Sequence, residues 1–308
     1  TCMYYYATSL YGFPVQKLIL HKGTGGNGKG LLNGLLLKGL GNYGYTLPSI
    51  VWLTELKDGA NPQVAGLNKK RFVISREPDD KKEIDQSTFK ELTGGGEISA
   101  RACHSNDSKV VLSGTNVFEL NELVRIGGEM GQAVYRRLVY IEFKSSFREG
   151  HEYDKAIERN IPNVFKLKNF DEEWHSKFKS VFIKYLMNWI KEYGFDNIKT
   201  PFICERSKKL SDDYIKKSDI FEEVIDDIIK PSVGSSIKMK TLWSKFKKHE
   251  SYDCLTKVEK RKHNRKWLEG KLKNHHTFAS LYTKNNQGSQ LNNYQIIDDE
   301  DPYDPDFV

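Results

Sequence analysis

The sequence predicts an α/β fold with a largely parallel sheet, followed by a smaller, mostly helical domain. Three observations indicate this arrangement. Short apolar runs alternate with helical patterns through the first half of the chain, as in sheets covered by helices on both faces. A glycine-dense turn joins the first apolar run to a Leu-rich helix. The last third holds helical patterns and then two weak strands, the outline of a winged helix.

The elements of the first domain follow from their apolar patterns and turn residues. A helical lead-in precedes a first strand over 15–22, and the helix after the glycine turn covers 29–40 and ends at Gly41. A helix over 84–92 and a hairpin over 98–112 come next along the chain. The remaining strands are expected at 70–75, 115–120 and 138–143.

A long amphipathic helix over 172–193 closes the first domain. Its large apolar residues recur at three- and four-residue steps: Trp174, Phe178, Val181, Tyr185 and Trp189. Gly194 ends this helix, and the stretch to Pro201 is the expected domain boundary.

The second domain begins with three expected helices and ends with two strands. The helices are expected near 205–230, 237–249 and 259–273, and the strands at 277–283 and 292–297. We therefore expect a first domain over 1–195, a winged-helix-like domain over 196–297 and an acidic, disordered tail over 298–308.

Composition excludes several classes of protein. With 38% hydrophobic residues in 308, the chain can bury a core, so wholesale disorder is not expected. No apolar run approaches the roughly 18–20 residues of a membrane span, so no membrane partner is expected. The cysteines form no CxxC pair, which disfavours a disulfide scaffold or zinc ribbon and fits a reducing intracellular compartment. Because the chain begins at Thr1, we expect it to be a piece of a longer protein.

Positive charge is concentrated near the C-terminus. The net charge is +7, but residues 237–284 hold 14 Lys/Arg against 4 Asp/Glu, whereas 298–308 hold 6 acidic residues and no basic ones. A basic segment with interspersed aromatic residues is typical of a nucleic-acid-binding face, because phosphates attract cations and bases stack on rings. A solvated, Lys-rich helical surface is the alternative. A zinc site at His249, Cys254 and His263 is not expected, because their spacing is irregular and a fourth ligand is missing.

The glycine turn matches the phosphate-binding pattern GxxxxGK between a strand and a helix. Backbone N–H groups of such a loop surround the β-phosphate, and Lys29 would reach the β and γ oxygens. The loop residues expected to bind nucleotide are Gly23, Thr24, Gly25, Gly26, Asn27, Gly28, Lys29 and Gly30. Gly30 departs from the pattern, because a Ser or Thr hydroxyl normally ligates Mg²⁺ there. Water or another side chain would complete the metal shell, or hydrolysis would be weakened.

A Ras-type GTPase is excluded by its missing partner motifs. The chain has no DxxG, and its one Asn-Lys pair, Asn68-Lys69, lacks the Asp two residues later that would read guanine.

Four blocks in order resemble a superfamily 3 helicase of the D5-like primase–helicase group of viruses, virophages, phages and plasmids. They are GTGGNGKG, NKKRFVISREPDD, FKELTGGGEISAR, and TNVFELNELVRI continuing to YRRLVYIEFKSSF, and together they cover about residues 16–147. Gly96 stands where the third block of the family usually has Asp. The resemblance implies an AAA+-like ATPase domain that assembles into hexameric rings.

The resemblance also implies roles for individual residues. Glu77 falls at the Walker B carboxylate, which would hold Mg²⁺ or its water and polarise the attacking water; Asp79 and Asp80 are weaker alternatives. Asn121 is preferred to Asn116 for sensor 1, which orients the lytic water at the γ-phosphate.

Arg136 and Arg137 fall at the arginine finger that enters the neighbouring subunit's ATP site, and which of the two reaches the phosphate stays open. The hairpin over 102–109 would line the channel of the ring. DNA contacts there are expected from Arg101, His104 and Lys109, although a lone His is more often structural or merely exposed.

These observations predict an ATP-dependent DNA helicase, the helicase part of a replicative primase–helicase, with ATP and Mg²⁺ as cofactors. Its partners would be single-stranded or forked DNA, identical subunits and replication proteins. Two alternatives remain: a nucleotide-binding DNA-docking module with impaired hydrolysis, which Gly30 motivates, and a P-loop kinase of a small molecule, which would need no arginine from a neighbour.

Overall fold

The computed structural model describes residues 1–12, 14–57, 60–79, 82–101, 109–128, 130–166, 172–194, 202–255, 257–275, 277–285 and 288–297. The chain forms two compact units, Thr1–Ile215 and Lys216–Val308. No helix in these ranges is long and apolar enough to cross a bilayer.

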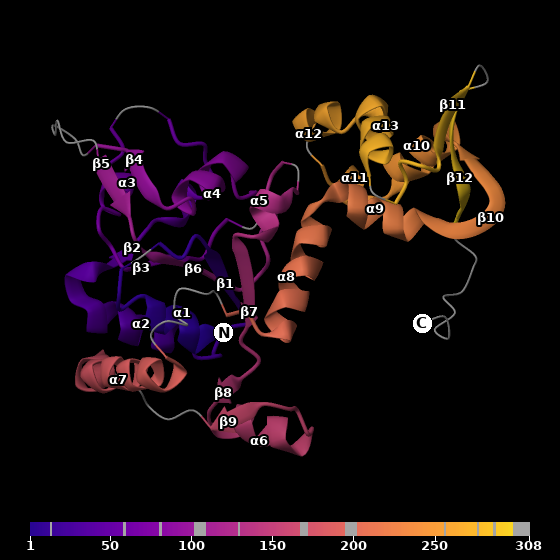
Figure 1. Cartoon of the computed structure of the whole chain (residues 1–308). Coiled ribbons are helices and arrows are strands. Elements are labelled where there is room, and N and C mark those ends of the chain that lie inside the picture. The colour runs from indigo at the N-terminus through magenta and orange to yellow at the C-terminus, as the bar shows by residue number, and fades with distance from the viewer. Residues whose placement is uncertain are drawn as a thin grey trace. The chain divides into compact units, whose positions relative to one another are not determined.

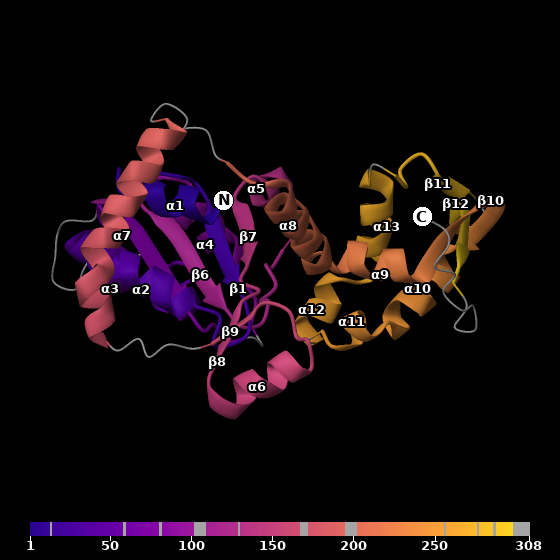
Figure 2. The ribbon, with the colours of Figure 1, turned by 90° about the horizontal axis from the view of Figure 1, so that it is seen from below.

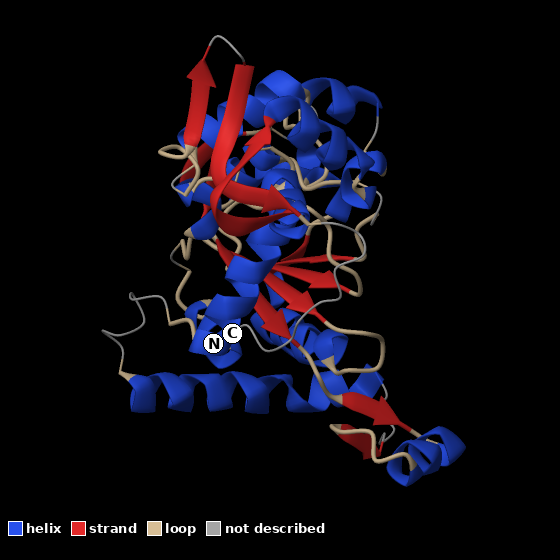
Figure 3. Ribbon diagram, turned by 90° about the vertical axis from the view of Figure 1, so that its right-hand side faces the viewer, coloured by secondary structure: helices blue, strands red, loops and turns tan. Residues whose placement is uncertain are grey.

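The first unit is built on a five-stranded parallel sheet with the order β2-β3-β6-β1-β7 (Figures 1 and 3). Its strands are β1 (Leu18–Lys22), β2 (Gly44–Thr46), β3 (Phe72–Arg76), β6 (Thr115–Leu120) and β7 (Leu138–Glu142). The prediction of an α/β fold with a parallel sheet is confirmed. The expected strand at 115–120 matches β6 residue for residue, and β2 was not expected, because its three residues are too short for a pattern.

Side chains of these strands alternate between two cores, one on each face of the sheet. In β1, Leu18 and Leu20 join one cluster and Ile19 joins the other. The same alternation holds in β6, where Phe118 packs on the first face and Val117 on the second. A two-residue side-chain period in a strand buried on both faces produces this arrangement.

Helices α1 (Cys2–Thr8), α2 (Lys29–Leu40) and α7 (Glu172–Tyr193) cover the second face (Figures 1 and 2). The other face packs against α3 (Pro62–Ala65), α4 (Gln86–Leu92) and α5 (Gln132–Tyr135). Short 3₁₀ turns η1 (Gly41–Tyr43) and η2 (Ser49–Val51) flank β2. The hairpin strands β4 (Gly96–Ser99) and β5 (Lys109–Leu112) pair antiparallel, as expected from the sequence.

The long helix α7 has the predicted bounds but buries a different stripe. Leu186 and Ile190 are buried, whereas Phe178, Val181 and Tyr185 of the expected stripe are 40%, 60% and 53% exposed. The side chain of Trp174 lies outside the described residues. Because α7 is apolar on two sides, its spacing alone could not select the buried one. Gly39 of α2 accommodates the observed packing, because a Cβ there would lie 2.8 Å from Cγ1 of Ile183 and would require Ile183 to shift.

A small segment follows β7. Strands β8 (Ser146–Arg148) and β9 (Val164–Lys166) pair in parallel around α6 (Gly150–Glu158). Helix α8 (Glu205–Ser218) then packs on the first unit, since Tyr214 and Ile215 belong to its core and Ser211 Oγ accepts a hydrogen bond from Tyr140 N at 2.9 Å. The division therefore falls between Ile215 and Lys216, later than the expected boundary at 195, because the apolar face of α8 is buried in the first unit.

The second unit has its own core around Phe221, Phe246 and Leu268. Its helices are α9 (Ile220–Ile228), α10 (Met239–Lys248), α11 (Glu250–Asp253), α12 (Lys257–Lys262) and α13 (Arg265–Asn274). A three-stranded sheet, β10-β12-β11, completes it with β10 (Ile229–Lys238), β11 (Tyr282–Asn285) and β12 (Gly288–Ile296).

Three expectations for the second unit need correction. The single helix expected near 205–230 is two helices, because Asp219 begins α9 as an N-cap and accepts a hydrogen bond from Phe221 N. The helix expected near 259–273 is likewise two, with Asn264 capping α13 through Trp267 N. Strand β10 was not expected, because Pro231 and Gly234 are typical of a turn. Proline and glycine are tolerated in β10 because it is an edge strand and carries a bulge. The expected acidic tail lies outside the described residues.

Candidate nucleotide-binding site

The glycine loop joins β1 to α2 at the carboxyl end of the sheet, and α2 begins at Lys29. Gly26 and Gly28 have φ of 71° and 84°, the left-handed region that glycine adopts at least cost. A Cβ at Gly28 would also lie 3.3 Å from the Phe147 ring. Phe147 N donates to Gly26 O at 2.8 Å, and Gly23 N donates to Leu120 O at 3.2 Å. The loop is therefore fastened on both sides by neighbouring backbone.

Lys29 lies inside this loop and is 6% exposed. Its Nζ donates to Gly23 O and to Oδ1 of Asn121, the second at 3.3 Å. Burial lowers the pKa of Lys29, and the nearby carboxylate of Glu119 opposes that shift. Asn27 closes the loop from the other side, because its Nδ2 donates to Thr24 O and its Oδ1 accepts from Lys29 N at 3.3 Å. The amine is thus held among acceptors that an incoming phosphate could replace.

Asn121 and Glu77 follow directly after the neighbouring strands β6 and β3. Glu77 N donates to Glu119 O at 3.2 Å, so the two strand ends lie side by side. Glu77 is exposed and has φ of 46°, unusual for a residue with a side chain. The structure therefore places Asn121 against Lys29 and Glu77 at the adjacent strand end.

The alternatives from the sequence were Asn116 for sensor 1, and Asp79 and Asp80 for the Walker B carboxylate. Asn116 is near the start of β6, buried, and its Nδ2 donates to Leu92 O at 3.4 Å. At about 3.3 Å per strand residue it lies about 16 Å from Asn121. Asp79 pairs with Lys82 at 3.7 Å on the surface, and Asp80 lies outside the described residues.

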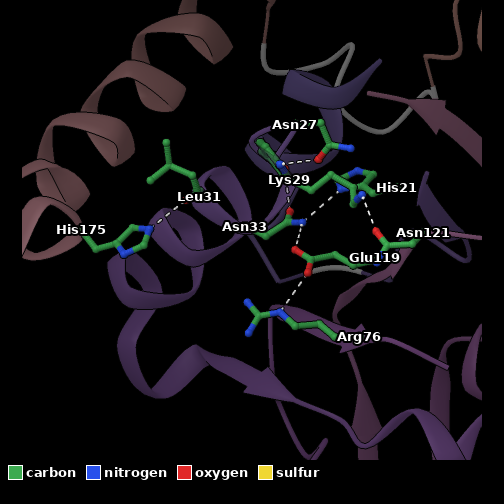
Figure 4. A network of polar contacts seen from close by, with 10 residues as sticks. His21, Asn27, Lys29, Leu31, Asn33, Arg76, Glu119, Asn121 and His175 are labelled. Atoms are coloured by element: carbon green, nitrogen blue, oxygen red, sulfur yellow. Dashed lines mark hydrogen bonds and ion pairs between the residues drawn. The ribbon is translucent and has the colours of Figure 1, made fainter. Parts of the chain in front are cut away.

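A buried polar network lies beneath the loop (Figure 4). Asn33, one turn after Lys29 on α2, accepts from Tyr6 Oη at 2.6 Å and donates to Oε1 of Glu119 at 2.6 Å. Its Nδ2 also lies 3.3 Å from His21 Nδ1. The second oxygen of Glu119, Oε2, pairs with Nε of Arg76 at 3.0 Å. Burial, with Lys29 nearby, lowers the pKa of His21 to about 3.

Sequence reasoning missed this network, although a signal was present. Glu119 stands inside an otherwise apolar strand, TNVFEL, and Asn33 inside a Leu- and Gly-rich helix. Buried polar residues of this kind need partners. The five residues of the network come from five different elements, α1, β1, α2, β3 and β6, which the sequence did not bring together.

The two candidate finger arginines differ in burial. Arg137 is 9% exposed, its Nη1 donates to Ala133 O at 3.0 Å, and burial lowers its pKa. Arg136 is exposed, and within the described residues its side chain makes no hydrogen bond or ion pair. Arg136 is therefore the arginine whose guanidinium can reach another molecule.

The predicted DNA-contacting residues lie around the β4–β5 hairpin. Lys109 begins β5, and its Nζ lies 3.5 Å from Oε2 of Glu97 across the hairpin, with both side chains largely exposed. Arg101 is exposed just after β4 and forms a backbone bridge with Ala60. His104 lies outside the described residues.

Three cavities adjoin the loop. One of about 650 Å³ lies between Thr24–Gly26 and the α6 segment, where its lining includes Arg148, Lys155 and Arg159. A second, of about 560 Å³, is mostly apolar and is lined by Leu31, Leu32, Phe143 and Phe147. A third, of about 470 Å³, opens beside Gly30 and is lined by Lys38, Arg76, Glu119 and His175, with Gly34 and Leu37. Volumes of this size suit a nucleotide or part of one.

The residues beside Gly30 do not fit a directly bound Mg²⁺ ion. Gly30 supplies no hydroxyl, Arg76 brings a positive charge, and both oxygens of Glu119 already accept contacts from Arg76 and Asn33. Glu77 is an exposed carboxylate at this edge that a hydrated ion could reach. Among the described residues, no group of three or more His, Cys, Asp or Glu side chains could hold a metal ion. His249, Cys254 and His263 are among the residues described.

Comparisons with known proteins agree with this architecture. No family model matches the chain. The chain is 25% identical over 287 residues to L207/L206, an inferred helicase of Acanthamoeba polyphaga mimivirus, and the match covers 91% of this chain. It spans 29% of the length of that relative. Among solved structures, the apo C-terminal region of NrS-1 superposes with a TM-score of 0.50 at 13% identity, covering 96% of this chain and 71% of that one. The chain thus resembles a viral helicase candidate in sequence and shares the α/β fold of the NrS-1 region.

Proposed function

We propose that the chain is the ATPase part of a DNA helicase of the D5-like superfamily 3 group. The observation that carries this proposal is the contact of Lys29 Nζ with Asn121, beside the strand end that carries Glu77. A phosphate-binding lysine, a polar group and a carboxylate at adjacent strand ends are the set that nucleotide hydrolysis needs. The sequence likeness to the mimivirus protein supports the helicase class.

Each residue then has a part in hydrolysis. Lys29 and the loop N–H groups would bind the β- and γ-phosphates. Glu77 would accept a proton from the attacking water, and Asn121 would orient that water at the γ-phosphorus. Arg136 of a neighbouring subunit would stabilise the charge that develops on the transferred group. Glu77 is the residue that would contact the hydration shell of a nucleotide-bound Mg²⁺ ion, which would supply neutralisation of the phosphate charge.

DNA would be held by two basic regions. The β4–β5 hairpin, with Arg101 and Lys109, would face one strand inside a ring of subunits, and the basic segment 237–284 of the second unit would dock on DNA. Exposed Lys and Arg side chains on α10, α12 and α13 support the second role, because backbone phosphates bind such surfaces without sequence preference.

The test is steady-state ATP hydrolysis with and without single-stranded DNA. Lys29→Ala, Glu77→Gln and Arg136→Ala should each lower kcat at least about 100-fold, in the range of lost electrostatic stabilisation. Lys184→Ala, an exposed lysine of α7, should have no effect. In mixtures, Arg136→Ala and Lys29→Ala subunits should together recover activity, since an arginine acts on a neighbour's site.

Gly30 supports one competing function, a nucleotide-binding DNA-docking module that does not hydrolyse ATP. It predicts ATP binding that Lys29→Ala abolishes, with no turnover under any DNA condition. Binding without turnover would therefore replace the helicase proposal, and turnover that is indifferent to Lys29→Ala would overturn both.

A further inference from the structure

The cavity beside Gly30 is lined by Arg76, the residue directly before Glu77, the expected metal carboxylate. Mg²⁺ in such sites is normally held by a hydroxyl directly after the loop lysine and by an acidic side chain at the end of the neighbouring strand. Here the first position is Gly30, and the last residue of β3 is Arg76, with the carboxylate Glu77 directly after it. Gly30 and Arg76 line the same cavity of about 470 Å³.

Strand alternation fixes the side on which Arg76 lies. Phe72 and Ile74 of β3 pack in the core on the α2 face, so Arg76, two residues further on, lies on that face too. Glu119 follows Val117 of β6 in the same way, and register pairs Arg76 with Glu119. Figure 4 shows Arg76 joined to Glu119, and Glu119 joined in turn to Asn33 of α2.

The ion pair with Glu119 orients the Arg76 guanidinium and uses only its Nε nitrogen. Among the described residues Glu119 contacts Nε of Arg76 and none contacts its two Nη nitrogens, which can bind an anion; the Arg76 side chain is 40% exposed. Glu119 is itself held by Asn33 of α2, so Arg76 is connected to the helix that begins at Lys29. A planar guanidinium held at one nitrogen is well suited to bind phosphate oxygens with the others.

We propose that Arg76 is a phosphate-binding residue that takes over the binding contribution of the metal, so that the chain binds nucleoside triphosphate with little dependence on Mg²⁺. This inference rests on the proposed nucleotide site and deepens it. It concerns binding only, since turnover would still use Glu77. Lys29 and Arg76 would each bring a positive charge to the triphosphate.

Binding of ATP and ADP, measured by calorimetry on the full chain in excess Mg²⁺ and in EDTA, tests the proposal. Wild type should change its Kd less than about threefold between the two conditions. Arg76→Gln should bind ATP about tenfold or more weakly in EDTA, the size of a lost hydrogen bond to a charged group. Arg76→Lys should lie between them, because it keeps the charge and loses the planar fork.

Two further variants sharpen the result. Gly30→Ser in the Arg76→Gln background should restore tight binding in Mg²⁺ but not in EDTA, because a Cβ at Gly30 meets nothing within 4 Å and the hydroxyl can ligate the metal. Arg206→Gln is the matched control: it also breaks an Arg–Glu ion pair, at 2.7 Å to Glu142, in the same unit and outside the cavity. It should bind like wild type in both conditions.

The outcomes separate the two proposals. A wild type that loses ATP binding in EDTA, or an Arg76→Gln variant that is unaffected there, overturns the role of Arg76 and leaves the nucleotide site intact. Failure of wild type to bind ATP in either condition, or indifference to Lys29→Ala, overturns the proposed function itself.

Discussion

Replacing Asn33 by Ala removes the side chain at the centre of the buried polar network. Tyr6 Oη then has no acceptor at 2.6 Å, and Oε1 of Glu119 has no donor at 2.6 Å. Asn33 is fully buried, so water does not simply take its place. An unsatisfied buried hydroxyl costs about 1–3 kcal/mol, and a lost hydrogen bond to a charged group about 1.5–3 kcal/mol. We expect Asn33→Ala to lower the free energy of unfolding of the first unit by about 3–5 kcal/mol.

Hydrogen exchange followed by mass spectrometry is the appropriate assay, because a chain with two units need not unfold in one step. Peptides from α2 and β6 should exchange about 100-fold faster or more, while peptides from α13 in the second unit stay unchanged. Tyr6→Phe removes only the hydroxyl and should cost about 1 kcal/mol. If Asn33→Ala costs no more than Tyr6→Phe, Glu119 does not depend on Asn33 and the reasoning is refuted.

Three other predictions concern single positions. His21 has a pKa of about 3 in the folded chain and 6.5 in the unfolded chain, so between these pH values the unfolded state binds one more proton. The free energy of unfolding should therefore fall as the pH drops from about 6.5 toward 3, by up to about 1.4 kcal/mol per pH unit. The urea midpoints of His21→Gln should lack this component of the pH dependence. Hydrogen bonds with Ser207 and Thr1 lower the pKa of Cys204 to about 7, whereas burial raises the pKa of Cys2 to about 11. Iodoacetamide at pH 7.5 should therefore label Cys204 faster than Cys2, and equal labelling of these two thiols would contradict this. Gly28→Ala should lower the free energy of unfolding by at least about 1 kcal/mol, because position 28 has a positive φ and its new Cβ would lie 3.3 Å from the Phe147 ring. Thermal unfolding would detect this change.

Local patterns were sufficient for most of the first unit. The bounds of α2, β6 and α7 follow from glycine stops and from uninterrupted apolar runs, which depend on neighbouring residues only. The buried side of α7 and the assignment of α8 to the first unit could not be predicted, because each depends on a surface that distant parts of the chain provide.

The candidate site divides in the same way. Lys29 and its loop are adjacent in sequence and carry a recognisable spacing, and Asn121 and Glu77 were placed by a family resemblance. Arg76 and Glu119 have no motif of their own. They face each other only because β3 and β6 pair in this register, so their relation becomes visible only in the folded chain.

The left-handed backbone of Glu77 has an evolutionary consequence. A residue with a side chain costs roughly 1–2 kcal/mol there relative to glycine, so Glu77→Gly would relax the chain at this strand end. If the carboxylate is needed for turnover, selection for heat resistance alone would favour its loss. Position 77 is then a place where thermal stability and activity favour different residues. A glutamate that remains there when variants are selected for stability would indicate that ATP turnover is also being selected.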